Sequence, residues 1–300
     1  MSHVQVRPAD QDSSAAKVTS RTLLEKKRRR EPITALTAYD YPTARIVDEA
    51  GIDLILVGDS LAMTVLGHES TLSLTVEEML HHARAVRRGV HRAFLVVDMP
   101  YGSYHLNTEA TLRNALSFVK QGGAEAVKIE GGHRRAPLVE ELTAAEIPVV
   151  GHIGLTPQSV LKMGGYRVQG RSLPEMDELL ADAAALEEAG AVALVLEGIP
   201  RELAEQITES AKIPTIGIGA GPGCDGQILV FHDVFDLAFT PAAKFVRSFG
   251  DGSALFRQGI ERYREEVVAR TFPADAESYH WPREMTSSMH LPIRPVSLAS

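Results

Sequence analysis

The chain has little of what marks secreted, membrane-spanning or nucleic-acid-binding proteins. A single cysteine, Cys224, excludes an internal disulfide framework and suits a reducing compartment. No apolar run approaches the roughly 18 residues that a membrane-spanning helix needs, and the N-terminus lacks the basic-then-apolar pattern of a signal peptide. The formal net charge of −8 argues against a nucleic-acid-binding surface. These absences leave a cytoplasmic enzyme, without nucleic-acid or membrane partners, as the expected class.

What the chain does have is enough apolar residues for one large domain. Hydrophobic residues make up 44% of its 300 residues, a length that single α/β barrel domains commonly reach. Residues 1–19 are polar and aperiodic, so we expect a disordered N-terminal tail. We expect one domain over residues 20–280 and a C-terminal tail over 281–300.

Apolar, β-branched runs alternate with amphipathic stretches along the chain. The stretches 76–88, 108–121 and 175–189 have helical spacing, and Gly190 stands where the last of them should end. Continuous apolar strands that alternate with helices indicate a parallel sheet covered on both faces. Eight such runs favour a closed (β/α)8 TIM barrel over an open sheet, with 242–270 as the final helices. The predicted strands are 33–38, 54–58, 94–99, 126–130, 148–153, 193–197, 214–218 and 227–231.

A short helix is predicted before the first strand. Ser20 is placed to cap its N-terminus, and Pro32 follows its basic last residues, 26–30, as a stop signal. We interpret these basic residues as a solvated helix end that is favourable to the helix dipole, in preference to a nucleic-acid site.

Four acidic residues stand where predicted strands end. Asp59, Asp98, Glu130 and Glu197 each close or follow an apolar run. A buried carboxylate is costly unless a metal, a cation or hydrogen bonds compensate it. Because the C-terminal strand ends of a (β/α)8 barrel form its active-site face, we expect these acids to converge there as catalytic or metal-binding groups.

Strand alternation places further side chains beside the acids. Successive residues point to opposite faces, so Lys128 and Glu130 face the barrel interior together if the apolar residues between them face the helices. The same argument sends Glu197 and His152 inward.

Each of these residues, taken alone, has a structural explanation. Lys128 and Glu130 can form a buried ion pair, and Asp59 can cap the helix that follows it. Asp98, before a Met-Pro pair, can be a turn residue, and His152 can be a satisfied core histidine. Convergence at one barrel mouth is what favours a functional explanation.

The donor set suits one kind of chemistry. Oxygen ligands without a Cys/His cluster favour Mg²⁺ or another hard divalent cation. Such a cation can chelate a 2-oxo acid and stabilise its enolate, while a further carboxylate removes the proton α to the ketone. Lys128 then supplies a cation for the substrate carboxylate, with a Schiff-base lysine as the competing role. The residues therefore indicate a metal-dependent enzyme with enolate chemistry.

Longer segments sharpen this interpretation. They are TAYD (37–40), VGDS (57–60), GHEST (67–71), VDMPYGSY (97–104), VKIEGG (127–132), GHIGLTPQ (151–158), GGYRVQGR (164–171), EGIP (197–200) and IGIGAGPGCDGQ (216–227). In these segments the chain resembles the ketopantoate hydroxymethyltransferase family, in consistent order from about residue 18 to about residue 280. The resemblance implies a barrel of the phosphoenolpyruvate/pyruvate type that forms ketopantoate in pantothenate biosynthesis.

The resemblance also implies roles for the residues of the barrel mouth. Asp59 and Asp98 would hold Mg²⁺ beside the bound substrate, with Glu130 as a third ligand, directly or through water. Ser60 and Lys128 would bind the substrate carboxylate.

Two further residues complete the implied catalytic set. Glu197 would remove the C3 proton of 3-methyl-2-oxobutanoate, and His152 would support the reaction near the keto oxygen. The co-substrate would be 5,10-methylenetetrahydrofolate, for which Tyr101, Tyr104 and the segment 67–71 are the candidate neighbours. The family association further implies a large homo-oligomer, such as a homodecamer.

Two alternatives remain from the sequence. Another metal-dependent 2-oxo-acid lyase or mutase of the same barrel superfamily would use the same metal site. A non-catalytic barrel scaffold would be expected to lack one of the mouth residues, such as Asp59, Asp98, Lys128 or Glu197.

Overall fold

The computed structural model describes residues 16–239 and 242–282, which divide into two compact units. One unit ends at Gly250 and the other begins at Asp251, and each is described by itself. Of the predicted tails, residues 1–15 and 283–300 lie outside the described residues. Val18 is only 2% exposed and its backbone N–H donates to the carbonyl of Arg92, so the packed part begins before residue 20. The domain boundary at residue 280 stays a prediction.

Eight parallel strands of the first unit close into a barrel in chain order, which confirms the predicted fold class. The barrel closes where β8 pairs with β1, with Gly226 opposite Ile33. The observed bounds agree with the predicted runs to within a residue or two. The strands are β1 (Ile33–Thr37), β2 (Leu54–Val57), β3 (Phe94–Asp98), β4 (Ala126–Glu130), β5 (Val149–Gly154), β6 (Ala193–Glu197), β7 (Thr215–Ile218) and β8 (Gly226–Leu229).

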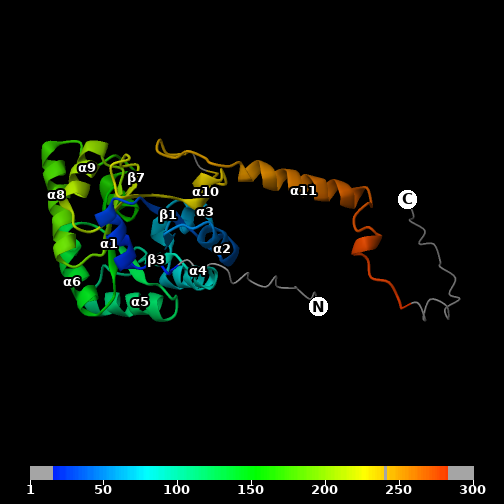
Figure 1. Ribbon diagram of the computed structural model, residues 1–300, viewed down its shortest axis with the longest axis horizontal. Helices are drawn as coiled ribbons and strands as arrows, with labels where there is room; N and C mark the ends of the chain where they lie inside the picture. The colour runs from blue at the N-terminus through cyan, green and yellow to red at the C-terminus, as the bar shows by residue number, and fades with distance from the viewer. Residues whose placement is uncertain (1–15, 240–241, 283–300) are drawn as a thin grey trace. The chain divides into compact units, whose positions relative to one another are not determined.

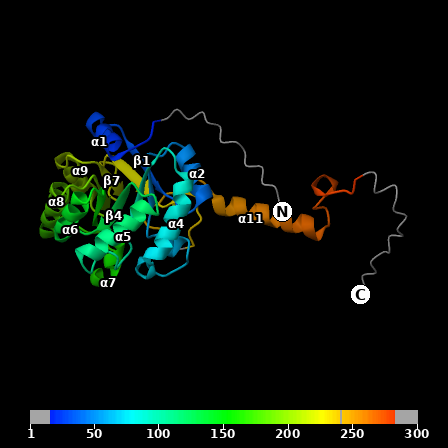
Figure 2. The same ribbon diagram turned by 90° about the horizontal axis from the view of Figure 1, so that it is seen from below.

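Helices surround the strands of this unit (Figure 1), and α1 and α7 lie at opposite ends of the barrel (Figure 2). Its α-helices are α1 (Ser20–Arg29), α2 (Tyr41–Glu49), α3 (Leu61–Thr64), α4 (Val76–Gly89), α5 (Thr108–Lys120), α6 (Ala136–Ala144), α7 (Val160–Met163), α8 (Leu173–Glu188), α9 (Arg201–Ser210) and α10 (Phe231–Val234). Short 3-10 turns are η1 (Thr71–Ser73), η2 (His133–Arg135) and η3 (Pro157–Ser159).

Side-chain caps fix where several helices begin. Thr75 and Glu78 form a capping box at α4, and the Asn107 side chain accepts from the third residue of α5. The predicted cap of α1 is wrong: the cap is Thr19, and Ser20 is the first helical residue. Thr19 takes this role because its hydroxyl accepts from the backbone N–H of Thr22, three residues on.

The core has two layers, one inside the barrel and one between the strands and the helices. Residues of β4 show the division, because Val127 and Ile129 pack in the outer layer. Lys128 and Glu130 therefore face the interior, as predicted. Apolar side chains that fill the inner layer include Leu54, Leu56, Phe94, Val96, Val150, Val195, Ile216 and Ile228.

Three acids stand directly before strands at the base of the barrel, and each pairs with a lysine of the N-terminal segment. Asp53, before β2, lies 2.5 Å from Lys26 Nζ. The other two pairs are Glu125 with Lys17, at 2.6 Å, and Asp225 with Lys27, at 2.7 Å.

The interpretation of residues 26–30 as a solvated helix end is therefore wrong for its first two lysines. The side chain of Lys27 is only 13% exposed, and Lys26 is 22% exposed. Both reach across the base of the barrel to acids that are distant in sequence, so they attach α1 to it.

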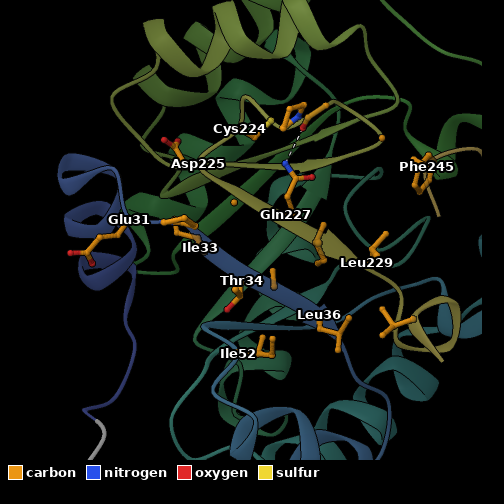
Figure 3. Close-up of a pocket in the computed structure, with 18 of the residues that line it drawn as sticks. Glu31, Ile33, Thr34, Leu36, Ile52, Cys224, Asp225, Gln227, Leu229 and Phe245 are labelled. Carbon is orange, nitrogen blue, oxygen red and sulfur yellow. Dashed lines mark hydrogen bonds between the residues drawn. The ribbon is translucent and has the colours of Figure 1, made fainter. Parts of the chain in front are cut away.

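The outer face of β1 and β8 is less covered than the rest of the barrel. Thr34 and Gln227 are exposed, whereas the strands from β2 to β6 are almost entirely buried. Helix α10, which follows β8, has only four residues and is too short to cover this face. Figure 3 shows the resulting groove, of about 920 Å³, with Gln227 bonded to the carbonyl of Gly221 at its edge.

The second unit, where it is described, consists of α11 (Gly252–Val268) and the 3-10 turn η4 (Asp275–Glu277). Asp251 caps α11 by accepting from the N–H of Ala254. The predicted final helices over 242–270 are thus one long helix. No helix in the described part of the chain is long and apolar enough to cross a membrane.

Candidate active site

All seven predicted site residues line one pocket of about 320 Å³ at the C-terminal ends of the strands. They come from four strands and the turn after β2, so the barrel brings together residues that are far apart in sequence. The seven are Asp59, Ser60, Asp98, Lys128, Glu130, His152 and Glu197. Apolar side chains of the inner barrel, such as Val195 and Ile228, form the floor of the same pocket.

Asp59 and Asp98 are neighbours at the ends of β2 and β3. Oδ2 of Asp98 accepts from the backbone N–H of Asp59 at 2.9 Å. The Asp59 side chain caps no helix, since the N-cap of α3 is Ser60 and makes no side-chain cap bond, and Asp98 closes a strand and forms no turn. The structural explanations for these two acids therefore do not account for them.

Burial raises the pKa of both acids. The pKa of Asp59 lies well above its ordinary value because the group is desolvated and faces Asp98 and Glu130. The pKa of Asp98 is also raised by burial, although the charge of Lys128 lowers it in part. Ionising both carboxylates side by side is therefore costly, and a further positive charge beside them would reduce that cost.

Lys128 stands between the acids and the histidine. Its Nζ lies 3.1 Å from Asp98 Oδ1 and 3.0 Å from His152 Nδ1. Burial lowers the pKa of Lys128, but the carboxylates around it, Asp98 first, raise it above its ordinary value. The ammonium group is thus charged at neutral pH, which does not suit a Schiff-base nucleophile.

His152 lies between two carboxylates. Its Nδ1 is 3.4 Å from Glu130 Oε1, and its Nε2 is 3.2 Å from Glu197 Oε2. Burial and the charge of Lys128 lower its pKa, but Glu130 and Glu197 outweigh them and raise it to about 9. Burial raises the pKa of Glu130 too, yet His152 and Lys128 hold it below its ordinary value. The two carboxylates therefore favour the protonated ring, whereas Lys128 Nζ, 3.0 Å from Nδ1, can donate to that nitrogen only when the nitrogen carries no proton.

Ser60 is held by a tyrosine from the end of β1. The hydroxyls of Tyr39 and Ser60 lie 2.7 Å apart, and the Ser60 side chain lines the pocket. Burial raises the pKa of Tyr39 to about 12, so its hydroxyl stays protonated. Sequence reasoning included the segment 37–40 only as a motif and gave Tyr39 no role.

The residues present fit a hard divalent cation. No three His, Cys, Asp or Glu side chains among the described residues form a complete metal cage. Mg²⁺, however, is usually held by one or two carboxylates, with water and substrate oxygens completing its shell. Asp59 and Asp98 provide such a pair, and among the described residues the buried Oδ1 of Asp98 has the ammonium of Lys128, 3.1 Å away, as its ion-pair partner but no hydrogen bond. Glu130 fits a water-mediated role better, since its Oε2 already accepts from the backbone N–H of Gln158.

Sequence reasoning missed Gln158 and the main contact of Tyr104. Gln158 is 5% exposed and bonds to both Asp59 and Glu130, although it does not line the pocket. Tyr104 is buried and donates to Gln158, so its hydroxyl is not free for a co-substrate. Tyr101 is 43% exposed, and of the segment 67–71 only Thr71 lines the pocket. The one sequence feature that could have indicated Gln158 is its place in the motif 151–158, which also contains His152.

Known proteins were compared with the chain as a whole. The model of the family described as ketopantoate hydroxymethyltransferase matches residues 17–275. A relative from Koribacter versatilis (strain Ellin345), named 3-methyl-2-oxobutanoate hydroxymethyltransferase, is 60% identical over 92% of this chain and 94% of its own length. The chain belongs to the ketopantoate hydroxymethyltransferase family.

Solved structures of low sequence identity share the barrel fold of this chain. The chain resembles 2,3-dimethylmalate lyase, of the PEP mutase/isocitrate lyase superfamily, with a TM-score of 0.53 and 17% identity over 84% of this chain and 98% of that one. It also resembles phosphonopyruvate hydrolase in complex with oxalate and Mg²⁺, with a TM-score of 0.55 and 16% identity over 88% of this chain and 92% of that one. These likenesses show the shared barrel fold.

Proposed function

We propose that the chain transfers a hydroxymethyl group from 5,10-methylenetetrahydrofolate to 3-methyl-2-oxobutanoate, forming 2-dehydropantoate (ketopantoate) and tetrahydrofolate in pantothenate biosynthesis. One observation carries the proposal: all seven expected residues line one pocket of a chain that matches this family over residues 17–275. The name of the 60% identical relative supports the same substrate. The family match extends far beyond the metal site, which favours this activity over the lyases and mutases.

Asp59 and Asp98 would hold the divalent cation, with Glu130 bonded to it through water. The cation would be Mg²⁺, which suits an all-oxygen donor set and is named with the structurally similar phosphonopyruvate hydrolase. When bound, it would polarise the keto group of the substrate and stabilise the negative charge that develops on its oxygen.

Lys128 and Ser60 would bind the substrate carboxylate. Lys128 is a fixed cation, because Asp98 and His152 hold its Nζ from two sides. The Ser60 hydroxyl, in contact with the Tyr39 hydroxyl, can donate to a carboxylate oxygen. Asp59 and Asp98 would contact the same substrate through the cation that they hold.

Glu197 would be the general base. It closes β6 and lines the pocket, and at 16% its side chain is the most exposed of the four mouth acids. Glu197 would take the C3 proton of the substrate, and the resulting carbon nucleophile would bond to the methylene carbon of the folate. The bonds from this carbon to the two folate nitrogens would break, and water would supply the hydroxyl oxygen of the product. His152, whose Nε2 lies 3.2 Å from Glu197 Oε2, would support the reaction close to the keto oxygen.

The proposal also covers the partners, the compartment and the oligomeric state of the enzyme. The partners would be small molecules, a 2-oxo acid and a folate, and the enzyme would act in the cytoplasm as a homo-oligomer such as a homodecamer. Tyr101 and the segment 67–71 remain the proposed neighbours of the folate.

The test follows the C3 proton of 3-methyl-2-oxobutanoate by NMR in D₂O with purified protein. We expect Mg²⁺-dependent loss of this signal, and formation of ketopantoate when 5,10-methylenetetrahydrofolate is added. An unchanged signal with both Mg²⁺ and tetrahydrofolate present would contradict the proposal and favour a different 2-oxo acid as substrate.

A further inference from the structure

Gln158 is a neutral residue with an unusually complete set of buried bonds. It lies in η3, the turn after β5, and is 5% exposed. Its Nε2 donates to Asp59 Oδ2 at 2.8 Å and to the carbonyl of Met99 at 3.0 Å. Its Oε1 accepts from the Tyr104 hydroxyl at 2.6 Å, and its backbone N–H donates to Glu130 Oε2 at 2.9 Å.

These bonds determine the orientation of the Gln158 amide. Turned the other way, its oxygen would face a carboxylate oxygen and a carbonyl, while its NH₂ group would face the donating hydroxyl of Tyr104. Tyr104 is itself held, because its oxygen accepts from the backbone N–H of Glu130 and the guanidinium of Arg135 lies 5.0 Å from its ring centroid.

The bonds also determine which carboxylate oxygens remain available. Asp59 uses Oδ2 and Glu130 uses Oε2 in accepting from Gln158. Oε1 of Glu130 is buried and accepts no hydrogen bond from the described residues, although His152 Nδ1 lies 3.4 Å away. Both acids thus keep one oxygen for another ligand while the second oxygen fixes their rotation.

We propose that Gln158, held by Tyr104, is a positioning residue that orients the carboxylates of Asp59 and Glu130 for the divalent cation. The inference rests on the proposed function only in taking Asp59 as a ligand of the cation and Glu130 as bonded to it through water. Gln158 does not line the pocket, so it acts through the acids and not on the substrate. Groups behind metal ligands typically change metal affinity by about 10- to 100-fold when they are removed.

The test measures Mn²⁺ binding by electron paramagnetic resonance, without substrate, in the full chain. Gln158→Met keeps the length of the side chain and the backbone N–H but removes the donor to Asp59. We expect the Mn²⁺ dissociation constant to rise at least tenfold. Tyr104→Phe, which removes only the hydroxyl, should raise it by a smaller factor.

The double variant distinguishes positioning from general damage. If Tyr104 acts through Gln158, adding Tyr104→Phe to Gln158→Met should change the constant little further. Thr111→Val is the matched control, because it removes a buried hydroxyl bond within α5, away from the site. It should lower thermal stability and leave Mn²⁺ binding unchanged.

Each outcome has a distinct meaning. Wild-type affinity in Gln158→Met, or multiplicative effects of the two substitutions, would overturn the positioning role and leave the proposed function intact. If the wild-type chain itself binds no Mn²⁺, the metal site of the proposed function fails, and the positioning role fails with it.

Discussion

The two ends of the barrel contain buried acids in opposite circumstances. At the base, burial raises the pKa of Asp53, but bonds from Lys26 and Thr34 hold it below the ordinary value. Arg92 also donates to this carboxylate. At the mouth, burial raises the pKa of Asp59, which lies beside further acids. Among the described residues, only Gln158 forms a hydrogen bond to the Asp59 side chain.

The difference shows what each end contributes. Acids matched with lysines stabilise the fold, and here they attach the N-terminal segment to the barrel. Acids that outnumber the cations around them are costly to bury at the mouth, and a bound cation can relieve that cost. Residues at the base of such barrels generally serve stability, and those at the mouth serve chemistry.

The largest expected effect is on the mouth acid that should act as base. Glu197→Gln keeps the size of the side chain but removes its ability to accept a proton. We expect the rate of deuterium exchange at C3 of 3-methyl-2-oxobutanoate to fall by about 10²- to 10⁴-fold, with substrate binding retained. Exchange at the wild-type rate, measured by NMR, would refute the role of Glu197.

A smaller effect should separate substrate binding from metal binding at the mouth. Lys128→Met removes the cation proposed to hold the substrate carboxylate, so we expect the substrate dissociation constant to rise by roughly 10- to 100-fold. Mg²⁺ affinity should stay the same or increase, because a repelling charge beside Asp98 is lost. Calorimetric titrations that give the opposite order would indicate that Lys128 is only a structural ion-pair partner.

The smallest effect concerns the base and its response to pH. A carboxyl whose pKa is lowered by folding stabilises the protein above its unfolded pKa, and this stability is lost as the pH falls through the folded value. Lys26→Met should therefore cost about 1 kcal/mol at pH 7 and less in acid, where Asp53 is protonated. Equal losses at pH 7 and at acid pH, measured by urea denaturation, would exclude an ionic role for Lys26.

The barrel fold and most residues of its mouth could be predicted from local sequence pattern. Alternation along β4 and β6 sufficed to direct Lys128, Glu130 and Glu197 inward, because strand geometry has a fixed period of two. The closed barrel followed from the eight apolar runs alone.

Long-range pairing explains what sequence reasoning missed. Lys26 and Lys27 find their acids 27 and 198 residues away, a pairing that no local pattern reveals. Gln158 is uncharged, so no charge pattern in the sequence marks it as a site residue. Its role depends on the acids that the fold places around it. The groove at β1 and β8 was missed because their apolar runs resemble those of covered strands, although no long helix of the first unit follows β8.

The most direct test compares Asp53→Asn with Asp59→Asn in the metal-free protein at pH 7. Asp53→Asn should lower the free energy of unfolding by about 3 kcal/mol, because it leaves two cations at the base without their charged partner. Asp59→Asn should leave it unchanged or raise it, since it removes a charge that burial disfavours and keeps an acceptor for Gln158. Equal destabilisation by both substitutions would contradict the account that one end serves stability and the other serves chemistry.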